Sequence, residues 1–135
     1  GYPDRAAERA LLAGADRRDM VAGMLPMLSP GELEELQQLV QTIHAAEPLL
    51  NYLQDVIAAT RSGRWFVQGL SPRAAIALVR AAKAQALMCG RDYVAPDDVQ
   101  AIVAKTVAHR LVPLAQAGRG ALEQVRAMVD AVPLP

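Results

Sequence analysis

Residues 69–111 read GLSPRAAIALVRAAKAQALMCGRDYVAPDDVQAIVAKTVAHRL and decide the fold class. Ser71 and Pro72 are typical of a helix start, because serine caps the first amides and proline is pre-organised for the first helical position. The helix is predicted to run to about Cys89 and to end at Gly90, which suits the left-handed conformation past a helix end. Its centre is almost entirely alanine, isoleucine, leucine and valine, so we expect a buried central helix.

A second helix follows a brief extended link over residues 91–94. Pro96 is predicted to begin it, with Asp97 and Asp98 in its first turn, where carboxylates complement the positive end of the helix dipole. We expect this helix to run to about Arg110. The apolar residues at helical spacing predict its inward face and are Val99, Ile102, Val103 and Val107.

Further helix starts lie before and after this pair. Residues 29–32, Ser-Pro-Gly-Glu, are typical of a capping box, in which the serine and glutamate side chains each accept a hydrogen bond from the other residue's backbone amide. One helix is expected from Pro48 to about residues 62–63 and another over about residues 121–131. Alanine and leucine dominate the chain, and the residues that sheets prefer are sparse. The predicted fold class is therefore all-α, a helical bundle of about five helices.

The whole chain has 135 residues, a formal net charge of zero and 53% hydrophobic residues. That length suits one domain with a real core, and the hydrophobic share is too high for disorder. Zero net charge argues against nucleic acid or a membrane surface as a partner, because either would favour a basic excess. No apolar run approaches the roughly 18–20 residues that cross a bilayer. We expect a soluble, cytoplasmic domain.

The sulfur-containing side chains are expected to be structural. Cys89 is the single cysteine, which excludes an internal disulfide and fits a reducing compartment. A free cysteine behaves as a small apolar residue, so Cys89 is expected to be buried. Met20, Met24 and Met27 are expected to fill gaps in the core.

Several kinds of catalytic site are absent from the sequence. It contains no phosphate-binding loop of the form GxxxxGK followed by serine or threonine. Without that loop and an acidic magnesium site, the chain alone cannot position a nucleotide and its metal for hydrolysis. His44 and His109 stand far apart without metal-ligand spacing, so no metal site is predicted. A free-standing enzyme is not expected.

Arg73 is the residue whose position asks for an explanation. An arginine in the first turn of a helix has the wrong sign for the positive end of the helix dipole. One interpretation is an exposed arginine that pairs with a nearby acid. The other interpretation is that the helix N-terminus and the guanidinium together face an anion. The amides at a helix start attract phosphate, and the planar guanidinium of arginine can donate two hydrogen bonds to the phosphate oxygens.

The chain resembles the C-terminal lid domain of MoxR-type AAA+ ATPases. The resemblance rests on GLSPRA at residues 69–74 in combination with GRDYVAPDDV at residues 90–99. Residues 1–12, GYPDRAAERALL, resemble the segment in which that family's chain leaves its nucleotide-binding core. Residues 28–61 resemble the earlier helices of the lid, and the VPLP ending resembles the family's C-terminus.

This resemblance implies a division of the chain and a larger protein around it. A lid domain is expected over residues 1–112, and a linker and C-terminal helix, packed on the lid or trailing it, over residues 113–135. The family's phosphate loop and acidic magnesium motif would lie upstream of Gly1, so ATP and Mg²⁺ would be bound mainly by that core. Hydrolysis is implied for the full-length protein and not for this chain alone. The implied partners are the core in cis, neighbouring subunits of a ring, often a hexamer, and client proteins with von Willebrand factor A domains, which the ring would serve as a chaperone.

The resemblance also implies a role for the residues at positions 71–73. In that family an arginine at the start of this lid helix, called sensor 2, reaches the terminal phosphates of the nucleotide. Arg73 matches this catalytic and ATP-binding position, and Ser71 and Pro72 match the cap that aims it. One departure is Ala95, where the family pattern usually has a hydroxyl residue. Its absence is expected to weaken one helix cap by about 1 kcal/mol without touching the nucleotide site.

Two other functions remain open from the sequence. A free-standing helical adaptor could use the same scaffold only to bind protein, and a lid of a magnesium-chelatase-like subunit would share the architecture. A phosphate-binding loop upstream in the same reading frame distinguishes an ATPase lid from an adaptor.

Overall fold

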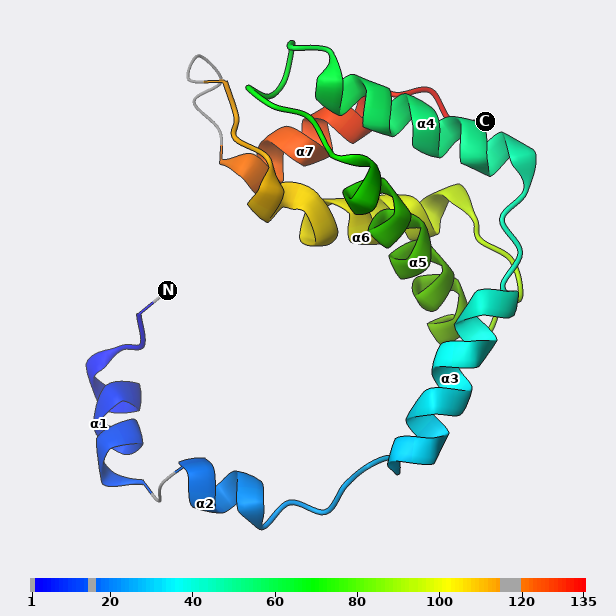
Figure 1. Ribbon diagram of the computed structural model, residues 1–135. Helices are drawn as coiled ribbons and strands as arrows, with labels where there is room; N and C mark the ends of the chain where they lie inside the picture. Colours follow the sequence, from blue (N-terminus) through cyan, green and yellow to red (C-terminus); the bar gives the residue numbers. More distant parts are fainter. Residues whose placement is uncertain (1, 15–16, 115–119) are drawn as a thin grey trace. The chain divides into compact units, whose positions relative to one another are not determined.

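The computed structural model describes residues 2–14, 17–114 and 120–135, and its regular elements in that part are all helices (Figure 1). The predicted all-α class is confirmed. By contacts the chain divides into two units, Gly1–Leu33 and Glu34–Pro135. Part of the predicted linker, residues 115–119, lies outside the described residues. The helices are α1 (Arg5–Ala13), α2 (Arg17–Ala22), α3 (Pro30–Thr42), α4 (Glu47–Arg61), α5 (Pro72–Met88), α6 (Pro96–Val107) and α7 (Ala121–Asp130), with a 3₁₀ turn η1 (Ala108–Arg110) after α6.

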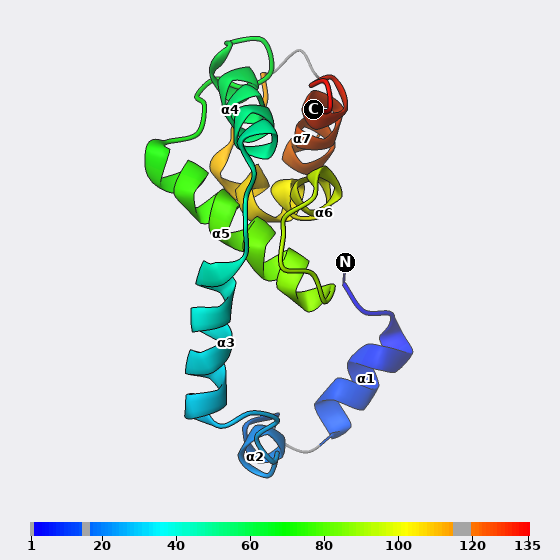
Figure 2. The same ribbon diagram turned by 90° about the vertical axis from the view of Figure 1, so that its right-hand side faces the viewer.

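Helix α6 holds the central place in the second unit. It contacts α5, α7 and α4, and Figures 1 and 2 show it between α5 and α7. Of its four predicted inward residues, Val99, Val103 and Val107 are buried, and Ile102 is partly buried against the same core. The core also takes side chains from α4, α5 and α7, and its fully buried members include Tyr52, Leu53, Val56, Leu78, Val125 and Met128.

Helix α5 buries one narrow face instead of its whole circumference. The buried residues recur every four positions and are Ala74, Leu78, Ala82 and Ala86. Because three of the four are alanine, the backbone of α5 can approach α6 closely. The prediction that this would be the buried central helix is wrong: Ile76, on another face, is 58% exposed. Composition alone did not reveal which face the helix would bury.

The loop between α4 and α5 is fixed to the segment after η1. Phe66, in this loop, is buried in the core. On either side of it, the amide of Val67 donates to the carbonyl of Val112 (2.9 Å) and the amide of Leu114 donates to the carbonyl of Trp65 (3.3 Å). The loop that leads into α5 is therefore held at its middle by paired backbone.

The first unit presents its described side chains to solvent. Helix α1 begins after Asp4, whose carboxylate accepts a hydrogen bond from the Ala7 amide at 2.8 Å. Among the described side chains before Glu34, none is buried. Met20, Met24 and Met27 are 56%, 70% and 94% exposed, so their prediction as core residues is wrong. The apolar faces of α1 and α2 are short, and no described residue covers them.

The capping box at the start of α3 is confirmed. The Ser29 amide donates to the Glu32 carboxylate at 2.7 Å, and the Glu32 amide donates to the Ser29 hydroxyl at 3.3 Å. The amide and hydroxyl of Ser29 lower the pKa of Glu32, because they favour its charged form. Helix α3 itself contains no buried side chain in the described part of the chain, so the box acts locally.

Replacing Ser29 with alanine is expected to destabilise the first turn of α3 by roughly 0.5–2 kcal/mol. Amide hydrogen exchange at Glu32 and Leu33 measures this, and both amides should exchange faster in Ser29→Ala. The midpoint of global unfolding should move little, because α3 buries no side chain in the described structure. Unchanged exchange at both amides would show that Ser29 does not hold this turn.

Candidate functional site

The start of α5 is built as the sequence predicts. Ser71 is the N-cap, with extended backbone (φ −72°, ψ 159°), and its hydroxyl accepts a hydrogen bond from the Ala74 amide at 3.3 Å. Pro72 occupies the first helical position. Arg73 therefore stands at the second position of a capped helix, immediately before the first residue that α5 buries.

The segment before this cap is attached to the end of α4. The buried Leu70 amide donates to the Thr60 hydroxyl at 3.1 Å, and the Arg61 Nε donates to the Leu70 carbonyl at 2.9 Å. Both polar backbone groups of Leu70 are thus bound by two consecutive residues of α4. Because Leu70 directly precedes the Ser71 N-cap, these two bonds fix where the first turn of α5 begins.

The Arg73 side chain is exposed and carries its charge without a partner in the described structure. It forms no hydrogen bond or ion pair with any described residue, and the first turn of α5 contains no acidic residue. The alternative in which Arg73 pairs with a nearby acid is therefore not observed within the described residues. The guanidinium remains available to a group outside this chain.

A groove runs beside the start of α5, between α5 and α4. Its volume is about 660 Å³, and its lining is mainly apolar, with Ile57 and Ala58 from α4 and Pro72, Ala75 and Ile76 from α5. Arg61 is the charged residue among those described along it. An apolar groove next to an unpaired arginine suits a ligand with an apolar part and an anionic part.

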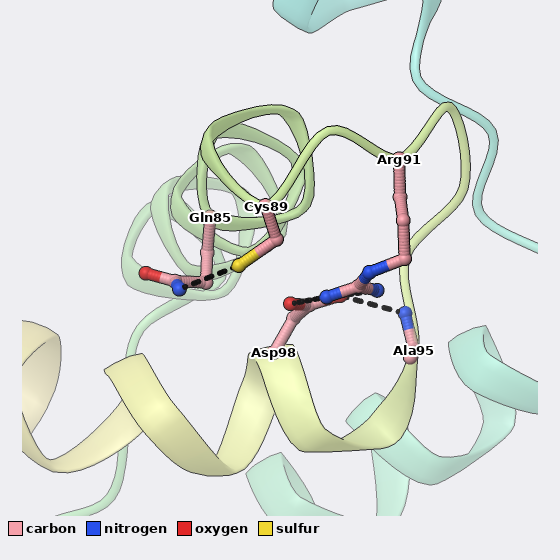
Figure 3. Close-up of polar contacts among 5 residues, drawn as sticks. All are labelled: Gln85, Cys89, Arg91, Ala95 and Asp98. Atoms are coloured by element: carbon pink, nitrogen blue, oxygen red, sulfur yellow. Dashed lines mark hydrogen bonds and ion pairs between the residues drawn. The ribbon is translucent and has the colours of Figure 1, made fainter.

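A second polar cluster fixes the link between α5 and α6 (Figure 3). The Arg91 guanidinium donates to both oxygens of Asp98, at 2.7 and 2.6 Å, and the Ala95 amide donates to the same carboxylate at 2.8 Å. Asp98 is 2% exposed, and Gly90, with a φ of 73°, supplies the predicted left-handed turn before Arg91. The carboxylate thus ties both ends of the link together.

Sequence reasoning missed this role of Asp98. It identified a first-turn carboxylate that complements the helix dipole, and the structure adds a buried ion pair. Burial by itself raises the pKa of Asp98, but the hydrogen bonds from Arg91 and from the Ala95 amide outweigh it, so the pKa is lowered. A signal was present: Asp98 stands three residues after the N-cap Ala95, where a capping-box carboxylate belongs.

Two further expectations concern the same region. Cys89 is exposed, not buried, because it is the C-cap of α5 and lies off the buried face. Its sulfur accepts a hydrogen bond from the side-chain Nε2 of Gln85 at 3.4 Å (Figure 3). Ala95 is the N-cap of α6 and offers no side-chain hydrogen bond, so the carboxylate of Asp98 supplies the remaining half of the cap.

Neither a metal centre nor a membrane span is found in the described part of the chain. No three histidine, cysteine, aspartate or glutamate side chains gather there in a way that could hold a metal ion. None of the described helices combines the length and the apolar character needed to cross a bilayer. The candidate functional site is the capped start of α5 with Arg73 and the groove beside it.

Known proteins resemble this chain in sequence and in fold. A model of the AAA lid domain matches residues 58–131. The chain is 33% identical over 138 residues to the uncharacterized protein YeaC of Bacillus subtilis, and this match covers all of this chain and 43% of that protein. It is 33% identical over 121 residues to Chaperone MoxR1 of Mycobacterium tuberculosis, covering 83% of this chain and 32% of the relative.

A solved structure from Cytophaga hutchinsonii, provisionally named an ATPase, matches with a TM-score of 0.75. The match covers all of this chain and 44% of that one at 24% identity, a likeness that shows the fold alone. The chain spans less than half the length of each of these three proteins.

Proposed function

Because the chain belongs to the AAA lid domain family and is of the MoxR type, we propose that it covers bound ATP in a larger ATPase and directs Arg73 at the nucleotide's phosphates. The observation that carries this proposal is the state of Arg73. A capped and anchored helix start holds it in place, and its charge has no partner among the described residues. Such a guanidinium can stabilise negative charge that develops on a transferring phosphoryl group.

The residues at the start of α5 suit a phosphate and not a metal ion. Arg73 offers only hydrogen-bond donors, and the described first turn of α5 has no carboxylate that would repel phosphate. Mg²⁺ binds through carboxylates and phosphate oxygens, so this part of the chain has no ligands for it. Bound Mg²⁺ neutralises charge on the phosphates of ATP, and we assign it and most of the nucleotide to a core upstream of Gly1. The apolar groove beside Pro72 offers a surface for the less polar part of the nucleotide.

The assembly follows from the same proposal. The lid would work with its core in cis and with neighbouring subunits of a cytoplasmic ring. Chaperone MoxR1, a relative named for chaperone activity, supports a chaperone-like role. Client proteins with von Willebrand factor A domains are the partners we propose for that ring.

Three purified samples test the lid against the adaptor: this chain, the full-length protein, and the full-length protein truncated before Gly1. Only the full-length protein is expected to hydrolyse ATP with Mg²⁺, because the chain lacks a phosphate-binding loop and the truncated core lacks Arg73. Steady-state phosphate release measures the turnover of each sample. Turnover by the chain alone, or undiminished turnover by the truncated core, would contradict the lid function, and the second result would favour an adaptor.

A further inference from the structure

We propose that Thr60, at the end of α4, is a positioning residue for Arg73, and that it acts by fixing the backbone of Leu70. This inference rests on the proposed function of Arg73 at the phosphates. It assigns to α4, the helix that precedes α5 in the chain, the task of setting where α5 begins.

The Thr60 hydroxyl is fully engaged and buried. Thr60 is 1% exposed; its hydroxyl donates to the Ile57 carbonyl at 2.6 Å and accepts from the Leu70 amide at 3.1 Å. The first bond orients the hydroxyl within α4, and the second holds the residue just before the Ser71 cap. A buried amide without its acceptor costs free energy, so the Leu70 backbone has a strong reason to stay where Thr60 places it.

The next residue of α4 completes this attachment. The Arg61 Nε donates to the Leu70 carbonyl at 2.9 Å, so both polar backbone groups of Leu70 are held from α4. Leu70 is 4% exposed, which excludes most water from competing for these groups.

Gly69 permits the close approach on which these bonds depend. A Cβ at this position would lie 2.5 Å from the Arg61 Cγ, 2.7 Å from the Arg61 Cα and 2.8 Å from the Thr60 carbonyl oxygen. Real Cβ atoms essentially never approach other atoms so closely, and two of these three atoms belong to the backbone of α4. Any side chain at residue 69 must push the segment away from α4.

This attachment decides the position of Arg73 because few residues separate them. Leu70 precedes the Ser71 cap, Pro72 has a fixed φ, and Arg73 follows directly. A displacement of the Leu70 backbone is therefore expected to displace Arg73 by a similar amount. Displacement of a catalytic group by about 1 Å can lower a rate by a hundredfold.

The test measures ATP turnover by the full-length protein carrying Thr60→Val, Thr60→Ser, Gly69→Ala or Gly31→Ala. Thr60→Val keeps the shape of the side chain and removes the acceptor, so turnover is expected to fall about tenfold. Thr60→Ser retains the hydroxyl and should keep most of the wild-type turnover. Gly69→Ala should lower turnover about as much as Thr60→Val does. Gly31→Ala is the matched control, because no atom lies within 4 Å of the added methyl group. Circular dichroism selects a temperature at which every variant is folded.

A double-mutant cycle with Arg73→Ala separates positioning from a general effect on structure. If Thr60 acts through Arg73, Thr60→Val should lower turnover in the wild-type background and hardly at all in the Arg73→Ala background. Equal losses in both backgrounds, or no loss in either, would overturn the positioning role. If Arg73→Ala alone leaves turnover unchanged, the proposed function of Arg73 fails instead.

Hydrogen exchange measured by mass spectrometry provides a readout that is independent of ATP. In the full-length protein, peptides that include the Leu70 amide should exchange at least tenfold faster in Thr60→Val than in Thr60→Ser. Equal exchange in the two variants would overturn the attachment to α4, whatever the turnover measurements show.

Discussion

Replacing Arg73 with alanine in the full-length protein is expected to lower ATP turnover by roughly a hundredfold or more. The guanidinium is exposed and unpaired among the described residues, and the proposed function places it against phosphate charge. Stability should hardly change, because the charge of Arg73 opposes the helix dipole and its exposed side chain forms no buried contact. The free energy of unfolding of the same variant, measured by thermal denaturation, is expected to change by no more than about 0.5 kcal/mol.

Lysine at this position tests the chemistry of the contact. A point charge on a flexible stem cannot reproduce the planar fork of arginine, so Arg73→Lys should recover only a small part of the lost turnover. Arg80→Ala is the matched control, since it removes another exposed arginine from α5 two turns away. If Arg73→Ala lowers the free energy of unfolding by several kcal/mol and retains full turnover, Arg73 is a structural residue and its proposed role is wrong.

The parts of the fold that local chemistry dictates could be predicted from the sequence. Ser29 and Ser71 cap the helices assigned to them, and Gly90 has the predicted left-handed conformation. These features depend on residues within a few positions of one another. The valine face of α6 followed from its spacing for the same reason.

Features that depend on contacts between helices could not be predicted in the same way. Nothing in the local pattern around Thr60 indicates that its hydroxyl binds the Leu70 amide, because the partner lies ten residues away across a loop. The exposure of Cys89 depends on which face α5 turns towards α6, and the composition of α5 does not specify that face.

The candidate site divides along the same line. Its first-turn arginine and its cap were identified from residues 71–73, because both follow from a local pattern. Its support from α4 required the structure. The lid domain expected over residues 1–112 remains a prediction.

The largest expected loss of stability is at Asp98. Asp98→Asn should destabilise the fold by about 2–4 kcal/mol at neutral pH, because it replaces a buried carboxylate that accepts two hydrogen bonds from Arg91 and one from the Ala95 amide. Urea denaturation measures the change. Asp97→Asn is the matched control: Asp97 is exposed in the same first turn, so it tests the helix dipole alone, and it should cost no more than about 1 kcal/mol.

The pH dependence of this loss separates the ion pair from simple packing. The pKa of Asp98 is lower in the native state than its unfolded value of about 4. The unfolded chain therefore binds the proton more readily, so the stabilisation is complete above pH 4 and is lost as the pH falls through the native pKa. Asp98→Asn has no such proton to bind, and the gap in unfolding free energy between it and the wild type should narrow steadily on acidification below pH 4. A gap that stays constant from pH 7 to pH 3 would mean that the carboxylate acts through its shape, and that the charge shared with Arg91 contributes nothing to holding α5 and α6 together.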